Sequence, residues 1–357
     1  MSFLNSITGQ RSLLGVDIGT TSIKVAEVGM QDKKLHLVNY GILETYSYLE
    51  RFNEAFQTSS LKLSDNYIAS HLKLLLSKMG DHTKSAVFSV PAFSVFSTLI
   101  EVPTASDSEI KKYIELQGKQ YIPLPLETVT IDWVKVGEKS VSDGASKQQV
   151  LLISIPNENI EKYKNICRLT GLRLDSVEVD GMSLARSFGD STPKSTLCID
   201  IGGRSTSLSI VSKGFLKYSG QIDFSGGSIT QAIANGLGIS QRRAEDLKKQ
   251  KGIGEGAAEH ELSTIILPIL DVIIYEAKKL VSNYETSYQE KVEGAFVTGG
   301  GSNLIGLPQY FTEHLEMPIV QANVFSNIAV PEILKSMSGG IGSLLGVSVG
   351  LSLKDLI

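Results

Sequence analysis

The chain has 357 residues, of which 42% are hydrophobic and 20% charged, and its formal net charge is −4. This composition is typical of a globular protein of about two domains, and the small negative charge provides no field that would favour nucleic acid or an anionic lipid surface. The two cysteines, Cys167 and Cys198, form no metal-ligand pattern with the five histidines, so we expect buried, reduced thiols. No secretory signal is visible, and we expect a cytoplasmic protein.

Two stretches of the chain share one pattern of strands and turns. An apolar strand that carries Asp17 near its end runs into a small polar turn, and an alternating strand, a second turn and a further strand follow. The same order recurs around Asp200. A β-meander repeated within one chain predicts two similar lobes that face each other across a cleft.

Helices are expected after each meander. The first is predicted at 64–80, and the second meander is followed by helical patterns at 228–252, broken near 236–240, and at 263–285. Near the end of the chain, 336–353 carries no charge over 18 residues. This length approaches what spans a bilayer, but the run is rich in glycine and only moderately apolar, so a buried loop and helix is favoured over a helix that touches a membrane.

The residues between the two repeats, 92–173, have no counterpart in the second half. They contain a strand, an amphipathic helix with Ser106 and Glu109 at capping-box spacing, two more strands separated by a polar loop, and a helix that ends at Gly171. This segment is predicted to form an inserted α+β subdomain.

The two Asp-containing turns have the chemistry of a phosphate site. Tight turns of Gly, Ser and Thr point successive backbone N–H groups into one concavity, which suits phosphate oxygens. Lys24 adds a positive charge to the first turn. Asp17 and Asp200 repel phosphate directly, but they can hold Mg²⁺, mainly through water, and the ion then bridges to the phosphates. Two such turns on opposite sides of a cleft would hold a polyphosphate between them.

A third glycine cluster, 299–302, follows another apolar strand and would let the backbone approach a flat ligand closely. Each of the three turns alone is a weak signal, and their order and spacing together carry the prediction. The chain contains neither a Gly-x₄-Gly-Lys-Ser/Thr P-loop nor a Gly-x-Gly-x-x-Gly turn after a strand, so the common alternative motifs for nucleotide binding are missing.

This order of motifs resembles the actin-like ATPase superfamily, which has two phosphate loops and an adenosine loop. The first phosphate loop would comprise Asp17, Gly19, Thr20, Thr21, Ser22 and Lys24, and the second Asp200, Gly202, Gly203, Arg204, Ser205 and Thr206. The resemblance gives the adenosine site to Gly226, Gly227, Glu245, Lys248, Gly299, Gly300, Gly301 and Ser302. The side chain of Arg204 could contact a phosphate or point to solvent.

Within the superfamily the whole chain resembles the PilM family of type IV pilus assembly, a relative of the division protein FtsA. The segments that carry the resemblance are 100–127, 171–188 and 307–328. It implies an α/β fold, a duplicated actin-like (ribonuclease H-like) ATPase fold with an inserted 1C subdomain. The expected division is 1–91 plus 174–195 as the first lobe (1A), 92–173 as 1C, and 196–357 as the second lobe (2A/2B), with 338–357 returning to the first lobe.

The same resemblance implies cofactors and partners. ATP or ADP with Mg²⁺ is expected in the cleft, and the cytoplasmic N-terminal peptide of the inner-membrane protein PilN is expected to dock near the groove between 1A and 1C. Other pilus motor and platform proteins and a second copy of the chain are further candidate partners. Association with the inner membrane would run through these partners.

Two other functions remain open at this point. A sugar kinase of the same superfamily has a similar first phosphate loop, but such kinases are generally longer and need a polar sugar pocket. A filament-forming FtsA-like division protein anchors itself through an amphipathic helix after a linker. Here the chain stops at 352–357, directly after an apolar stretch, which favours the platform protein.

Hydrolysis is expected to be slow or absent. Actin has a glutamine that positions the attacking water, and the matching position here holds Asp180. A carboxylate can orient water, but its charge repels a γ-phosphate. Asp180 and the nearby Glu178 are the candidate catalytic residues.

Overall fold

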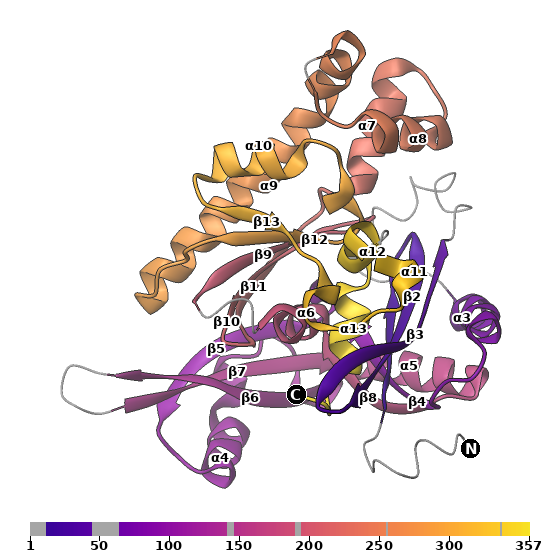
Figure 1. The fold of residues 1–357 in the computed structure, drawn as a ribbon. Helices are drawn as coiled ribbons and strands as arrows, with labels where there is room; N and C mark the ends of the chain where they lie inside the picture. The colour runs from indigo at the N-terminus through magenta and orange to yellow at the C-terminus, as the bar shows by residue number, and fades with distance from the viewer. Residues whose placement is uncertain (1–11, 45–63, 141–145, 190–193, 255, 336–337) are drawn as a thin grey trace.

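The computed structural model describes residues 12–44, 64–140, 146–189, 194–254, 256–335 and 338–357. Its strands form three sheets, two of five strands and one of three (Figure 1). The first sheet contains β1 (Leu14–Ile18), β2 (Ser22–Gln31), β3 (Lys34–Glu44), β4 (Ser85–Val90) and β8 (Arg173–Val179). The second contains β9 (Thr196–Ile201), β10 (Thr206–Ser212), β11 (Phe215–Ile222), β12 (Ala295–Thr298) and β13 (Ile319–Gln321). The third contains β5 (Phe96–Pro103), β6 (Val129–Ser140) and β7 (Ser146–Pro156).

The two large sheets have the same topology. Their strand orders are β3-β2-β1-β4-β8 and β11-β10-β9-β12-β13, so each is an antiparallel meander whose first strand also pairs in parallel with a later strand. The buried strands are nearly continuous apolar runs, as parallel pairing with helices on the faces requires. The predicted duplication of an α/β lobe is therefore confirmed.

Helices cover these sheets and join them. They are α3 (Asp65–Met79), α4 (Asp107–Gln117), α5 (Asn157–Thr170), α6 (Asp180–Phe188), α7 (Gly226–Leu237), α8 (Gln241–Lys251), α9 (Ala257–Tyr288), α10 (Leu307–Leu315), α11 (Glu332–Lys335), α12 (Ser338–Leu344) and α13 (Gly346–Ser352). Short 3₁₀ turns are η2 (Ala92–Ser94), η3 (Gly118–Gln120), η4 (Leu126–Thr128), η6 (Gly300–Asn303) and η7 (Val324–Asn327). The helix predicted at 64–80 has the expected ends. Ser64 Oγ accepts from the Tyr67 N–H at the start of α3, and Gly80, at φ +79°, ends the helix.

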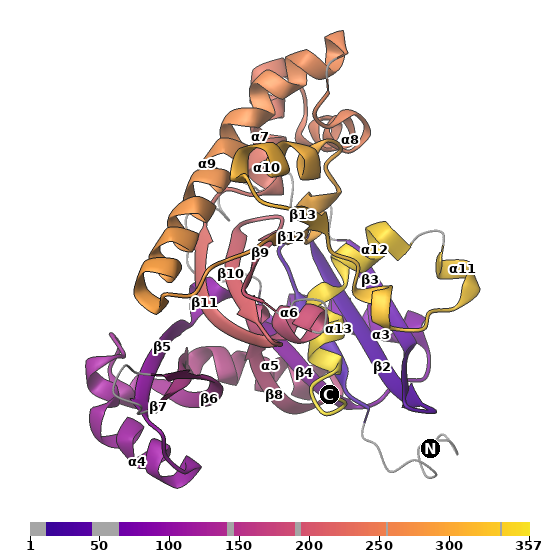
Figure 2. The ribbon, with the colours of Figure 1, turned by 60° about the vertical axis from the view of Figure 1, so that its left-hand side comes forward.

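The third sheet and α4 form a body with its own core. Ile110 and Ile114 of α4 pack on Val150 and Leu152 of β7. The predicted capping box is present, with Glu109 Oε2 accepting from the Ser106 N–H at 2.8 Å. Figure 2 shows this small body below the second lobe and to one side of the first.

Helix α5 lies inside the range predicted for the insertion, but it packs with the first lobe. Its buried Tyr163, Ile166 and Cys167 belong to the core formed by β1, β4 and α3, and Tyr163 Oη donates to the carbonyl of Ser89 at the end of β4. Topology gives the reason. In the second lobe α10 connects β12 to β13, and α5 makes the same connection to β8 after the inserted sheet.

The uncharged run near the C-terminus is largely buried. Every residue of α13 is buried, and this helix packs between α6 and the strands β1, β2 and β4. Ser352 Oγ donates to the Leu13 carbonyl at 2.7 Å and accepts from the Val28 N–H at 2.8 Å. Helix α13 thus fastens the end of the chain to the first lobe. Within the described residues, no helix combines the length and apolarity needed to cross a bilayer. Cys167 and Cys198 are buried, free thiols, as predicted.

Candidate functional site

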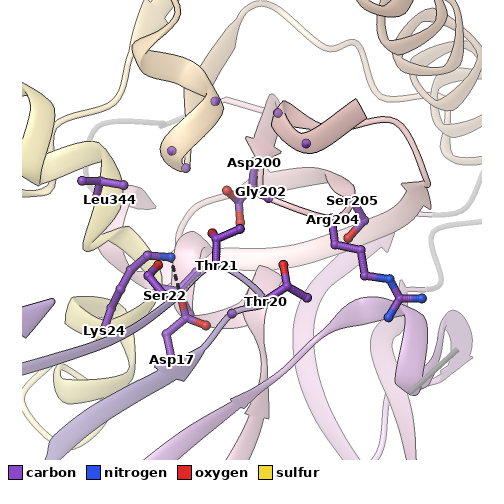
Figure 3. A pocket seen from close by; sticks show the side chains of 18 of the residues that line it. Asp17, Thr20, Thr21, Ser22, Lys24, Asp200, Gly202, Arg204, Ser205 and Leu344 are labelled. Atoms are coloured by element: carbon purple, nitrogen blue, oxygen red, sulfur yellow. Dashed lines mark hydrogen bonds and ion pairs between the residues drawn. The ribbon is translucent and has the colours of Figure 1, made fainter. Parts of the chain in front are cut away.

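A cavity of 460 Å³ lies where the two lobes meet, which is within the size range of small-molecule sites. Its walls come from both Asp-containing turns, the start of α7, α8 and the 299–301 turn (Figure 3). The predicted residues that line it are Asp17, Gly19, Thr20, Thr21, Ser22, Lys24, Asp180, Asp200, Gly202, Gly203, Arg204, Ser205, Gly226, Gly227, Glu245, Lys248, Gly299, Gly300 and Gly301. Segments almost 300 residues apart in the sequence thus meet at one site.

The first turn is closed by a hydrogen bond from the Gly19 N–H to the Ser22 carbonyl, 3.0 Å. Because β1 and β2 pair in antiparallel register, Asp17 stands opposite Lys24. Lys24 Nζ lies 3.1 Å from Asp17 Oδ2 (Figure 3). Ser89, at the carboxyl end of the neighbouring strand β4, donates to Asp17 Oδ1 at 2.8 Å. The carboxylate of Asp17 is therefore fixed from two sides.

The second turn repeats this backbone geometry with different side chains. The Gly202 N–H donates to the Ser205 carbonyl, again at 3.0 Å. Here Asp200 stands opposite Ser207, and Ser207 Oγ donates to Asp180 Oδ2 at 3.2 Å. Asp200 packs against Gly299, where φ is +80° and an added Cβ would lie 2.2 Å from Asp200 Oδ1. Only glycine fits there.

Three carboxylates line the cavity, those of Asp17, Asp180 and Asp200, and their charges are incompletely neutralised. Burial raises the pKa of Asp180 to about 7, and the charges of Asp200 and Asp17 act in the same direction. Burial and Asp17 raise the pKa of Asp200 to about 6, against the opposing charge of Lys24. Burial lowers the pKa of Lys24, but Asp17 and Asp200 outweigh it, so the pKa is raised. The site favours an additional positive charge.

A hydrated divalent cation suits this donor set. Among the described residues, no three acidic, histidine or cysteine side chains converge closely enough to hold a metal ion. Asp17 and Asp200 face the same cavity from opposite lobes, so a Mg²⁺ between them would keep several of its waters, as this ion prefers. The residues therefore fit Mg²⁺ held through water.

The other end of the cavity is built by α7, α8 and the glycine turn. The N–H groups of Gly226 and Gly227 donate to the carbonyls of Gly202 and Gly203 at 3.0 and 3.1 Å, which joins α7 to the second turn. Lys248 Nζ donates to the Gly226 carbonyl at 2.9 Å and to Glu245 Oε2 at 2.6 Å. Burial lowers the pKa of Lys248, while Glu245 opposes that shift. Burial raises the pKa of Glu245, but Lys248 outweighs it and the pKa is lowered. These bonds hold the two side chains in place at this end of the cavity.

Three predicted residues do not line the cavity. Thr206 Oγ1 donates to the Phe224 carbonyl at 2.7 Å, and Ser302 Oγ donates to the Gly299 carbonyl at 2.7 Å, so both hydroxyls stabilise the turns instead. Glu178, a candidate catalytic residue, is bound by Arg186 at 3.0 and 3.2 Å. Glu178 does not line the cavity, and this ion pair occupies both of its oxygens, so its position does not support the predicted catalytic role.

The sequence also left some wall residues unidentified. Ser89, Phe93, Ser207 and Leu344 line the cavity. Ser89 had a signal, because the carboxyl end of a strand parallel to β1 must lie beside Asp17. Phe93 had none. The guanidinium of Arg204 lies 4.6 Å from the centre of its ring, so Arg204 reaches the segment that leads into the inserted sheet.

Two duplicated lobes with Asp-x-Gly turns facing one cavity define the actin-like ATPase class of fold, and the relatives agree. The chain is 22% identical over 396 residues to the cell division protein FtsA of Pseudomonas aeruginosa, covering 95% of this chain and 90% of that protein. Its structure resembles MreB 5 of Spiroplasma citri bound to AMPPNP, with a TM-score of 0.55 and 16% identity over 96% of this chain and 95% of that one.

The family can be stated more narrowly. Residues 15–355 match the family model of the type IV pilus assembly protein PilM, and the chain belongs to this family. It also resembles the solved PilM–PilN type IV pilus biogenesis complex, with a TM-score of 0.82 and 22% identity over 97% of this chain and 99% of that chain. The predicted fold class and family are both confirmed.

Proposed function

We propose that this protein is a nucleotide-binding platform of type IV pilus assembly, which binds ATP or ADP with Mg²⁺ in the cavity between its lobes. The observation that carries the proposal is the pair of turns, Gly19–Ser22 and Gly202–Ser205, which are closed by equivalent hydrogen bonds and open on one cavity with an aspartate beside each. Membership of the PilM family and the AMPPNP-bound relative support it.

Each part of the cavity has a role in this proposal. Backbone N–H groups of the two turns hold phosphate oxygens, and Lys24 adds a charge-assisted hydrogen bond. Asp17 and Asp200 hold Mg²⁺ through water, and the ion neutralises phosphate charge. The fixed pair of Glu245 and Lys248 receives the ribose, and the glycine turn at 299–301 lies against the base.

Calorimetry with Mg²⁺ and ATP tests this site. Asp17→Ala and Asp200→Ala should each weaken the binding of ATP in the presence of Mg²⁺, because each removes one side of the ion site. Both should weaken this binding more than they lower the stability of the nucleotide-free protein. Binding of ATP measured in EDTA provides the control, since the loss should shrink there. Equal affinity in both variants and the native protein would contradict the proposal.

Turnover is proposed to be slow or absent. Asp180 begins α6 and faces the cavity, but it is an acid where an amide would position water without charge. A phosphate-release rate at or above roughly 1 per second, the ordinary range of enzymes, would contradict this. Asp180→Gln should not slow release, and a faster rate in this variant would support the positional argument.

The partner is proposed to be the cytoplasmic N-terminal peptide of PilN, which would dock near the inserted sheet and hold this protein at the cytoplasmic side of the inner membrane. The similarity to the PilM–PilN complex supports this, and a helix beside a sheet edge is a common receptor for extended peptides. A short peptide buries little area, so modest affinity is expected. Other pilus motor and platform proteins and self-association belong to the same proposal.

Deleting the inserted sheet tests the docking site. Residues 96–155 should be replaced by a short linker, while α5 is kept because Tyr163 and Ile166 complete the core of the first lobe. The variant should lose the PilN peptide and still bind ATP. A folded variant that binds both would show that the peptide docks elsewhere.

A further inference from the structure

A row of polar contacts joins the second lobe to the inserted sheet, outside the cavity. Strand β11 is the edge of the second sheet, and it approaches β5 and β6 of the inserted sheet (Figure 2). Ser219 Oγ of β11 lies 3.0 Å from Ser97 Oγ of β5. Lys217 Nζ, also on β11, donates to the Val136 carbonyl at 2.5 Å and to Gln149 Oε1 at 3.1 Å.

Lys217 is an unusual residue for such a contact. The residue is only 6% exposed. Among the described residues, no salt bridge pairs Lys217 with a carboxylate. Burial lowers its pKa, with Glu290 acting against that shift from farther away. A buried ammonium held by neutral oxygens gains little stability over an apolar side chain. Water solvates it readily once the contact opens, so this contact costs less to open than an apolar one.

The inserted sheet carries a receptor for this ammonium. The pairing of β6 with β7 slips between Lys135 and Gly137, which leaves Val136 as an extra residue, and the β-bulge turns its carbonyl out of the ladder. At Gly137, an added Cβ would lie 2.6 Å from Lys217 Nζ. The bulge and the glycine together make room for one lysine.

The other end of this row reaches the cavity. Strand β10 starts at Thr206, immediately after the second turn, and pairs with β11 along its length, with Ser209 opposite Ser219. Within that turn, the guanidinium of Arg204 lies over the ring of Phe93, which is three residues before β5. The second turn, β11 and the inserted sheet are thus connected through consecutive contacts.

We propose that Lys217, Ser219 and Arg204 form a latch between the second lobe and the inserted sheet, and that a terminal phosphate bound at the second turn opens it. This inference rests on the proposed binding of nucleotide. A phosphate attracts a guanidinium more strongly than a ring face does, so Arg204 leaves Phe93 when ATP occupies the turn. The turn then carries β10 and β11 with it, Lys217 leaves Val136, and the inserted sheet is released to reorient. ADP, which lacks the terminal phosphate, leaves the latch closed.

Disulfide trapping measures this directly. Cysteines at Ser97 and Ser219 (S97C/S219C) should crosslink efficiently in the nucleotide-free protein and with Mg²⁺ and ADP. Saturating Mg²⁺ and ATP should slow crosslinking at least fivefold. The matched control is T104C/S146C, whose hydroxyls lie 2.8 Å apart within the inserted sheet and whose crosslinking should not respond to nucleotide. The native Cys167 and Cys198 are buried and do not compete.

Two further variants separate the latch from the nucleotide site. Gly137→Ala in the S97C/S219C background should slow crosslinking without nucleotide, because the methyl group displaces Lys217. Arg204→Ala removes the contact with Phe93, as bound phosphate is proposed to do, so it should slow crosslinking without nucleotide and leave no further slowing in saturating ATP. If calorimetry shows ATP bound while crosslinking of S97C/S219C is unchanged, the latch is overturned. If no ATP binds, the proposed function fails, and the results of Gly137→Ala and Arg204→Ala without nucleotide then decide whether the contact is a latch.

Discussion

The two Asp-containing turns share one backbone hydrogen-bond pattern but carry different side chains. Each is closed by a 3.0 Å hydrogen bond at the same offset from its aspartate, in sheets of the same strand order. The position opposite the aspartate is Lys24 in the first turn and Ser207 in the second. The duplicated lobes therefore present two turns with the same backbone geometry, but only the first turn has a positive charge opposite its aspartate.

The inequality extends to the residues at the tip of each turn. Thr20 and Thr21 in the first turn correspond to Gly203 and Arg204 in the second. The small residue of one turn receives the larger residue of the other, since an added Cβ on Gly203 would lie 2.5 Å from Thr21 Cγ2. The first lobe thus supplies charge at the base of its turn, and the second supplies it at the tip. Substitutions at equivalent positions test this division.

The largest expected effect is at Lys24. Lys24→Met keeps the stem and removes the charge that would meet phosphate, so we expect binding of ATP to weaken by about 2–3 kcal/mol, roughly 30- to 150-fold. Ser207→Ala, at the equivalent position, should change affinity less than about threefold, because Ser207 supplies no charge. Isothermal titration of both variants makes the comparison. Equal losses would show that the two turns contribute alike.

A smaller effect concerns the stability of the nucleotide-free protein. The folded state holds a proton on Asp180 up to about pH 7, whereas the unfolded chain loses it near the ordinary value of 3.8. The free energy of unfolding therefore falls as pH rises between these values. Asp180→Asn removes this penalty and keeps an acceptor for the Gly181 N–H, which now lies 2.7 Å from Asp180 Oδ1.

We expect Asp180→Asn to be more stable than the native protein by about 1–2 kcal/mol at pH 8, with the difference vanishing near pH 4. Urea unfolding in EDTA at both pH values measures it. Asp200→Asn provides the comparison within the second turn. Its gain should be smaller, because Lys24 opposes the upward shift and holds the pKa of Asp200 to about 6. A gain at pH 4 as large as at pH 8 would exclude the carboxyl group as its cause.

The repeated meander allowed most of this architecture to be predicted from sequence. An alternating strand, a turn and an aspartate are local patterns, so the two lobes and the residues of both turns follow from them. The position of α5 does not, because an amphipathic pattern says that a helix buries one face but not which sheet receives it. Comparing α5 with α10 in the other repeat would have identified its sheet.

The corrected site residues show a similar limit. Thr206 and Ser302 carry the hydroxyl groups expected near phosphate and base, yet each donates to a backbone carbonyl instead: Thr206 to Phe224, which follows β11, and Ser302 to Gly299 in its own turn. Glu178 lies two residues before Asp180, but β8 ends at Val179 and Asp180 begins α6, so the alternation of side chains along a strand does not carry over from one to the other. Arg186, eight residues after Glu178 on α6, pairs with it. Tertiary contacts determine where the side chains of these three residues lie, and the spacing of residues in the sequence does not reveal such contacts.

The smallest expected effect is at the contact between the two turns. Gly203→Ala would place a methyl group against Thr21, which must rotate or move away, so the turns should separate slightly and ATP should bind about two- to fivefold more weakly, less than about 1 kcal/mol. Thr21→Ser removes the methyl group that is struck. The double variant should therefore recover most of the loss, which a double-mutant cycle measures as coupling of up to about 1 kcal/mol. Thr20→Ala, at the position equivalent to Gly203, is the control. Combined with Thr21→Ser it should show no such coupling, since the small residue is needed only in the second turn. Additive effects of Gly203→Ala and Thr21→Ser would mean that the turns do not set each other's spacing.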